Sequence, residues 1–138
     1  MSAEDQIRRT LARYIHSHDR NDPDGVMAEF TEGARLLVPS GARPVGRVAI
    51  RAFMEEQYTR RRAAKRRMKH LYGNSDIEVR GTAATVVSDW VAYESVDGGP
   101  WAINMIGQSI DQLVCENGQW LIAERHNIDS RSAPEAGV

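Results

Sequence analysis

The stretch WAINMIGQSIDQLVCENGQWLIAERHNID, residues 101–129, decides the fold because strand periodicity appears on both sides of a tight turn. Apolar and polar residues alternate along 101–115 and again along 119–129, which is typical of β-strands with one buried face. Asn117 and Gly118 lie between the two runs, and an Asn-Gly pair in that position is the strongest short-range signal of a β-hairpin. The stretch therefore predicts two long antiparallel strands.

Before this hairpin, the two-residue alternation of apolar and polar positions continues back to about residue 69. In most of the preceding part of the chain, apolar residues recur at helical spacing instead. The expected strands are residues 34–39, 69–79, 82–96, 101–115 and 119–129. The expected helices are residues 2–18, 23–33 and 46–61, the first capped by Ser2 and the second by Asp22 with Pro23 at its first position. The third helix should bury Val48, Ile50, Phe53, Met54 and Tyr58. Helices followed by a strand meander predict an α+β fold, with the helices on one concave face of the sheet.

Composition favours one ordinary globular domain, residues 1–138, with a loose tail from about residue 130. The net charge of −1 gives no reason to expect nucleic acid or membrane as a partner. Cys115 is the single cysteine, so no internal disulfide can form. The N-terminus is charged, and no apolar run approaches the roughly 20 residues of a membrane helix. We therefore expect a cytoplasmic protein.

Five short segments carry a family resemblance through their order and spacing. They are ARYIHSHD at 12–19, FTEGA at 30–34, GRVAI at 46–50, HLYGNSDI at 70–77 and GQWLIAER at 118–125. With these segments the chain resembles the SnoaL-like branch of the nuclear transport factor 2-like superfamily over residues 4–130. The resemblance implies a cone-shaped α+β barrel in which three N-terminal helices pack in the concave face of a curved, mostly antiparallel sheet. It also implies a homo-oligomer, a dimer or a trimer.

The same resemblance implies three catalytic residues. Lyase members of the branch carry an Asp at the end of the first helix and a His on the strand after the third helix, and Asp19 and His70 match them. Tyr14 matches a tyrosine of the family's bile-acid dehydratase. His70 would be the general base, Asp19 its orienting partner and Tyr14 a hydrogen-bond donor, with no metal or other cofactor required. Each residue also has a structural interpretation: core packing for Tyr14, a helix-end turn for Asp19, and a satisfied strand histidine for His70.

Further residues are candidates for substrate contact, although the face of each strand cannot be fixed without its register. They are Tyr58, Trp90, Asn104, Gln108 and Arg125. Arg125 and its neighbour His126 must point to opposite faces. We expect His16 and His18 at the surface, and we interpret the basic segment 58–70 as a solvated helix end.

Three functions remain open for a chain of this kind, because members of the branch differ in activity. The first is a lyase, most simply a dehydratase, acting on a small cyclic or polyketide-like compound in an enclosed pocket. The second is an isomerase or polyketide cyclase with a single carboxylate base, for which Asp89 or Asp111 would have to be buried beside an aromatic wall. The third is a non-catalytic ligand-binding protein, similar to a dioxygenase small subunit. A filled interior, or separation of Asp19 from His70, would favour the third.

Overall fold

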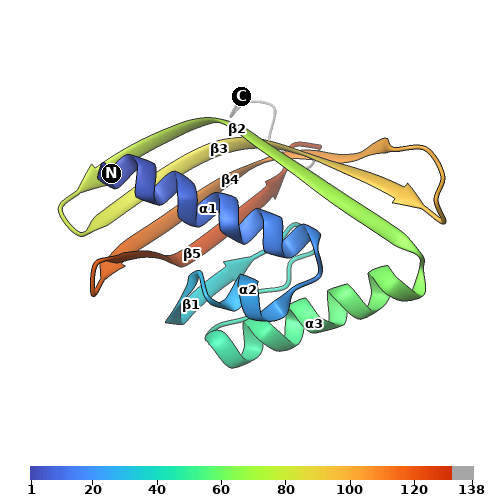
Figure 1. Ribbon diagram of the computed structural model, residues 1–138, viewed down its shortest axis with the longest axis horizontal. Helices are drawn as coiled ribbons and strands as arrows, with labels where there is room; N and C mark the ends of the chain where they lie inside the picture. Colours follow the sequence, from blue (N-terminus) through green and yellow to red (C-terminus); the bar gives the residue numbers. More distant parts are fainter. Residues whose placement is uncertain (132–138) are drawn as a thin grey trace.

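The computed structural model describes residues 1–131, and the expected loose tail lies mostly outside these described residues. The helices are α1 Ala3–Asp19, α2 Pro23–Met27 and α3 Arg47–Ala63. The strands are β1 Phe30–Leu37, β2 Arg66–Arg80, β3 Ala83–Val96, β4 Ala102–Glu116 and β5 Gln119–Asp129. Figure 1 shows the long strands lying behind α1, with α2 and α3 on the same side of the sheet.

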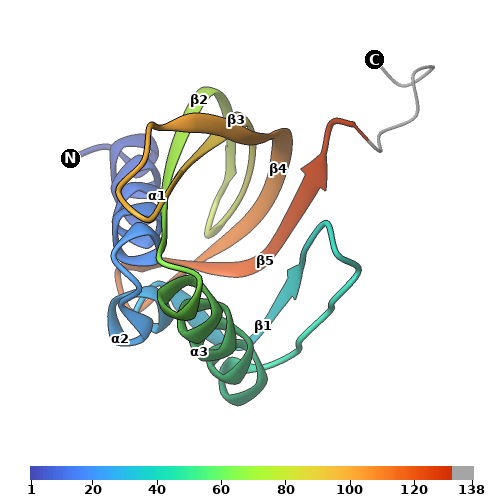
Figure 2. The same ribbon diagram turned by 90° about the vertical axis from the view of Figure 1, so that its right-hand side faces the viewer.

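One five-stranded sheet, in the order β1-β5-β4-β3-β2, forms the wall of the molecule. Strands β2 to β5 form an antiparallel meander, and β1 adds to β5 in parallel. Figure 2 shows how strongly this sheet curves, with the helices on its concave side. The expected α+β fold is therefore confirmed, including the mostly antiparallel curved sheet and the three helices preceding the meander.

The helix starts follow the predicted capping chemistry. The Ser2 side chain accepts a hydrogen bond from the backbone N–H of Asp5, and the Asp22 side chain accepts one from Gly25. The second helix is shorter than predicted, however, because it ends at Met27. Phe30 already pairs in register with Ile122 of β5, so sheet pairing replaces the last part of the expected helix and lengthens β1.

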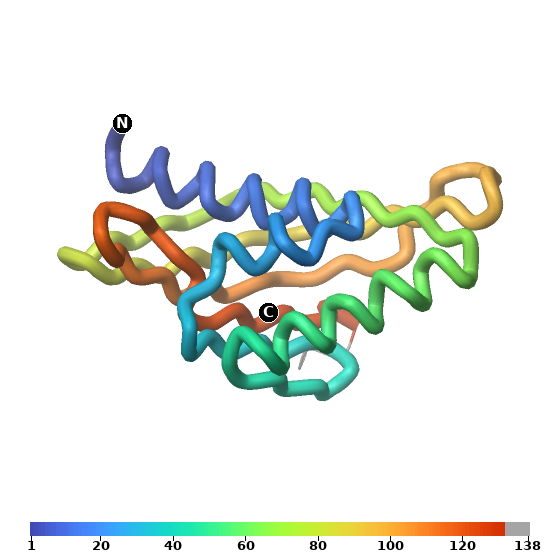
Figure 3. The backbone as a smooth tube through the Cα atoms, turned by 60° about the horizontal axis from the view of Figure 1, so that its bottom comes forward, coloured from blue at the N-terminus to red at the C-terminus, as the bar shows by residue number. Residues whose placement is uncertain are grey.

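The core forms where the helices meet the inner face of the sheet. In Figure 3, α1 runs along the yellow-green β2, while α3 lies beside the cyan β1 segment. Ile50, Met54 and Tyr58 form the buried side of α3, one turn apart. Val48 was expected to join them but is 86% exposed, because a step of two residues from Ile50 turns it to the other side of the helix. No helix within residues 1–131 is both long and apolar enough to span a membrane.

Candidate active site

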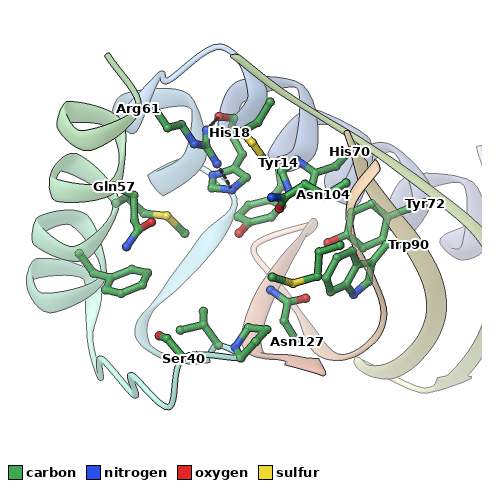
Figure 4. Close-up of a pocket in the computed structure, with 17 residues that line it drawn as sticks. Tyr14, His18, Ser40, Gln57, Arg61, His70, Tyr72, Trp90, Asn104 and Asn127 are labelled. Carbon is green, nitrogen blue, oxygen red and sulfur yellow. Dashed lines mark hydrogen bonds between the residues drawn. The ribbon is translucent and has the colours of Figure 1, made fainter. Parts of the chain in front are cut away.

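A cavity of about 250 Å³ lies between α1, α3 and the inner face of the sheet. Helix α1 contributes Tyr14 and His18 to its wall, and α3 contributes Arg61. The strands β2 and β3 contribute His70 and Trp90. Figure 4 shows these side chains arranged around the open centre, although they come from distant parts of the chain. The interior is therefore not filled by side chains.

His70 and Asp19 are directly bonded at this cavity. The imidazole Nδ1 lies 2.6 Å from Asp19 Oδ1, and the backbone N–H of His70 donates to Asp19 Oδ2 at 3.0 Å. The side chains are only 12% and 18% exposed, so water competes weakly for the pair. A carboxylate accepts, so His70 Nδ1 carries a proton and donates it in a hydrogen bond to Asp19. No residue in 1–131 hydrogen-bonds Nε2.

His18 lines the same cavity, and the expectation that it lies at the surface is wrong. It follows Tyr14 by four residues, so both occupy one face of α1, and their rings stack with centroids 5.8 Å apart. His18 Nδ1 lies 2.9 Å from the Tyr58 hydroxyl, and Arg61 donates to Nε2 at 3.0 Å. Since Arg61 can only donate, His18 Nε2 accepts and Nδ1 holds the proton. Both ring nitrogens of His18 are thus hydrogen-bonded, whereas in His70 only Nδ1 is.

Charge around His18 opposes its protonation. Burial is the main cause that lowers its pKa well below the ordinary value, and the nearby Arg61, His70 and Arg125 lower it further. The ring of His18 lies 5.2 Å from that of His70, centroid to centroid. Two histidines therefore lie side by side, and of the two only His70 has a ring nitrogen, Nε2, that no group within residues 1–131 hydrogen-bonds.

Tyr14 lines the cavity and packs in the core at the same time. Its ring is 2% exposed and meets Phe30 edge-on at 5.5 Å. Burial raises the pKa of its hydroxyl far above the ordinary value, only partly offset by Arg125, so the group stays protonated. Nothing within the described residues hydrogen-bonds this hydroxyl, which leaves it available as a donor to a ligand.

The other candidate contact residues divide into two groups. Trp90 and Asn104 line the cavity, whereas Tyr58 lies behind His18. Gln108 is exposed, because the buried positions of its strand are 107, 109, 111 and 113. Asn104 reaches the inner face only because β4 has an irregularity opposite the Ala92–Tyr93 step of β3, which places Asn104 outside the regular pairing.

Of the neighbours Arg125 and His126, which point to opposite faces of β5, Arg125 points inward. It forms a buried ion pair and does not line the cavity. Its NH1 lies 2.9 Å from both carboxylate oxygens of Asp111, and both side chains are 1% exposed. The guanidinium lies over the rings of Tyr14 and Tyr72, 4.6 and 4.9 Å from their centroids. Arg125 thus supports two residues of the cavity wall from behind.

The geometry weakens the two alternatives to a His–Asp lyase. Asp89 is exposed and accepts a hydrogen bond from Asn74. Asp111 is buried and its pKa is raised by desolvation, but Arg125 occupies both oxygens. The conditions that would favour a non-catalytic protein are also unmet, since Asp19 and His70 are bonded and the interior holds a cavity.

Several cavity residues were not singled out from the sequence. Arg61, Tyr72 and Asn127 line the wall, and Figure 4 shows Arg61 reaching from α3 to His18. Two atoms of wall residues, the donor Trp90 Nε1 and the acceptor Asn127 Oδ1, are fully buried and have no hydrogen-bond partner within residues 1–131.

The curved sheet, the cavity and the His–Asp pair define a small α+β protein with an internal cavity of about 250 Å³. The model of the SnoaL-like domain family matches residues 1–126, and the chain belongs to this family. The SnoaL-like resemblance that the sequence segments indicated is thus confirmed, and the chain shares its fold with a nuclear transport factor 2-like protein from Novosphingobium aromaticivorans that is 21% identical.

Solved structures agree with this assignment. A protein of unknown function from Mycobacterium tuberculosis is 28% identical, with a TM-score of 0.81 over 96% of this chain and 75% of that chain. A candidate scytalone dehydratase from Novosphingobium aromaticivorans is 26% identical, with a TM-score of 0.79 over 92% and 83%. A protein from Catenulispora acidiphila in complex with S-DNPA, 18% identical, shares the fold with a TM-score of 0.82 over 93% of both chains. No curated protein matches the sequence.

Proposed function

We propose that the protein is a cofactor-independent dehydratase that acts on a small cyclic or polyketide-like compound. The observation that carries the proposal is the 2.6 Å contact between His70 Nδ1 and Asp19 Oδ1, at a cavity of about 250 Å³. This contact leaves Nε2 as the basic nitrogen of a histidine at the cavity wall. The candidate scytalone dehydratase among the relatives supports the same reaction class.

The proposed reaction is the elimination of water from a β-hydroxy carbonyl compound. His70 Nε2 removes the proton from the carbon next to the carbonyl, and the Asp19 carboxylate stabilises the imidazolium that forms. The electron pair of the broken C–H bond forms the new C=C bond as the C–O bond breaks. The departing hydroxide takes the proton from the imidazolium and leaves as water, which returns His70 to its starting state.

Tyr14 has the role of donor in this scheme. Its hydroxyl is buried, protonated and without a protein partner in residues 1–131, so it can hydrogen-bond the carbonyl oxygen on which negative charge develops. Because its raised pKa keeps the Tyr14 hydroxyl protonated, Tyr14 cannot serve as the base, which leaves that role to His70.

The test is turnover by His70→Gln on a substrate found by screening hydroxylated ketones, followed through the absorbance of the conjugated product. Loss of the general base should lower the rate by about 10²-fold or more. His126→Gln is the matched control, since His126 is exposed on β5 and lies outside the cavity wall. A His70→Gln rate near that of the wild-type protein would sink the proposal.

A further inference from the structure

Arg61 is the one permanently charged side chain in the wall of the cavity, as far as the described residues show. It is half-buried, and no ion pair within residues 1–131 includes it. Its hydrogen-bond partners are neutral: NH1 donates to the backbone oxygen of His18 at 2.8 Å and to Asn21 Oδ1 at 3.0 Å, and NH2 donates to His18 Nε2 at 3.0 Å. A cation removed from water without an anion is costly, and proteins normally pair such groups.

Asp19 is a carboxylate that acts on the Arg61 charge, and it does so through space, without a hydrogen bond. Both of its oxygens already accept hydrogen bonds from His70. No carboxylate within residues 1–131 hydrogen-bonds the Arg61 guanidinium itself. The Tyr58 ring lies 5.3 Å from the guanidinium carbon, His18 is neutral, and Arg66 adds a second positive charge that acts on Arg61 at a distance.

The hydrogen bonds also fix the direction of the guanidinium. Three of its five N–H groups donate to His18, near the end of α1, and to Asn21, just beyond that helix, so two N–H groups have no partner within residues 1–131. A guanidinium held in this way binds an anion without losing further side-chain freedom, which is the condition for strong electrostatic stabilisation. Figure 4 shows Arg61 on the far side of His18 from His70, so the cation and the base are separated by one imidazole ring.

From these contacts we infer that the cavity selects a small ligand with an anionic oxygen, either a carboxylate or the ionised hydroxyl of a phenol or enol, and that Arg61 binds that oxygen. The volume of about 250 Å³ is below the range of about 300–1,000 Å³ typical of drug-sized ligands, so the ligand has one or two rings. This inference deepens the proposed function and rests on it for the choice of cavity. To the proposed function it adds that the substrate carries an anionic oxygen and that Arg61 binds this oxygen.

Binding, measured by calorimetry without turnover, tests the inference. The carboxylate arm compares 2-naphthoate with its neutral amide, 2-naphthamide. We expect wild-type protein to bind the carboxylate about 10- to 100-fold more tightly, the range for hydrogen bonds to charged groups. The phenolate arm uses 4-nitrophenol, whose absorbance should shift toward the ionised form on binding. Selectivity in either arm supports the inference, and the failure of both arms overturns it.

The variants assign the effect to one residue. Arg61→Gln should abolish the preference for naphthoate while leaving the affinity for naphthamide nearly unchanged. Arg62→Gln removes the same charge from the adjacent, exposed position of α3 and should keep the preference. If both variants lost the preference for naphthoate equally, the preference would come from the overall positive charge of this end of α3, and the role of Arg61 would be overturned. The comparison of the two probes on wild-type protein stands even if Arg61→Gln does not fold.

This experiment separates the inference from the proposed reaction. His70→Gln should lose turnover and keep the preference for naphthoate, because His70 does not contact the guanidinium. Retained turnover in His70→Gln would remove the dehydratase proposal and leave the anion site standing. Absent selectivity in wild-type protein would remove the anion site and leave the dehydratase proposal standing.

Discussion

Asp19→Asn is the substitution that most sharply tests how the His–Asp pair works. In the wild-type protein the carboxylate accepts two hydrogen bonds, from the backbone N–H and from the ring Nδ1–H of His70. An amide of the same shape offers one oxygen and one NH₂ group. If the oxygen keeps the backbone bond, the NH₂ group faces Nδ1, and the ring must move its proton to Nε2 to accept from it.

The consequences for stability and for activity differ in size. Each hydrogen bond to a charged acceptor contributes about 1.5–3 kcal/mol and a neutral one about 1 kcal/mol, so two replaced bonds should cost about 2 kcal/mol of unfolding free energy. Activity should fall by about 10²- to 10⁴-fold, because Nε2 then carries a proton and cannot act as a base.

Three measurements follow the change: urea unfolding, turnover, and the ¹⁵N shifts of the His70 ring. Asp22→Asn is the control, because Asp22 caps α2 through a side-chain oxygen and asparagine caps a helix equally well. The reasoning is refuted if the His70 ring of Asp19→Asn remains protonated at Nδ1, or if turnover stays near that of the wild-type protein.

Three further predictions concern stability. The pKa of His18 is depressed in the folded state, so below about pH 6.5 the unfolded chain binds more protons than the folded one. The free energy of unfolding should therefore decrease as the pH is lowered, by up to about 1.4 kcal/mol per pH unit. His18→Gln should remove this part of the pH dependence, measured by urea unfolding at about pH 7.5 and about pH 5. Gly107→Ala would place a Cβ against a backbone carbonyl of β5 and the indole of the cavity wall, and should cost about 1–3 kcal/mol or more, whereas Gly33→Ala meets no atom. Arg125→Met should cost about 3–5 kcal/mol by leaving Asp111 buried without its partner, and the double replacement Arg125→Met with Asp111→Leu should recover much of that loss in thermal unfolding.

The meander and the helix caps could be predicted because their signals are local. The alternation of 101–129, the Asn-Gly turn and the caps Ser2 and Asp22 each act within a few residues. The early start of β1 at Phe30 could not be predicted, because it depends on parallel pairing with β5 about 90 positions later. Apolar residues of 23–33 fit a helix or a strand, and the distant partner decides between them.

The candidate site shows the same division between local and distant information. Asp19 and His70 were identified through the family resemblance, and the structure places them in contact. Arg61 could have been found, since it continues the buried stripe of α3 three residues after Tyr58. The orientation of Gln108 needed the register of β4, where a one-residue shift reverses every side chain.

The two histidines of the cavity show why the type of a residue does not determine its role. His18 and His70 lie 5.2 Å apart between the same helix and sheet, and both line the wall. Arg61 and Tyr58 occupy both nitrogens of His18, which keeps that ring neutral and makes it a spacer. Asp19 occupies only Nδ1 of His70, which leaves Nε2 without a hydrogen-bond partner within residues 1–131. The partners that surround each ring therefore separate a structural histidine from a candidate base, and they place a cation one ring away from it.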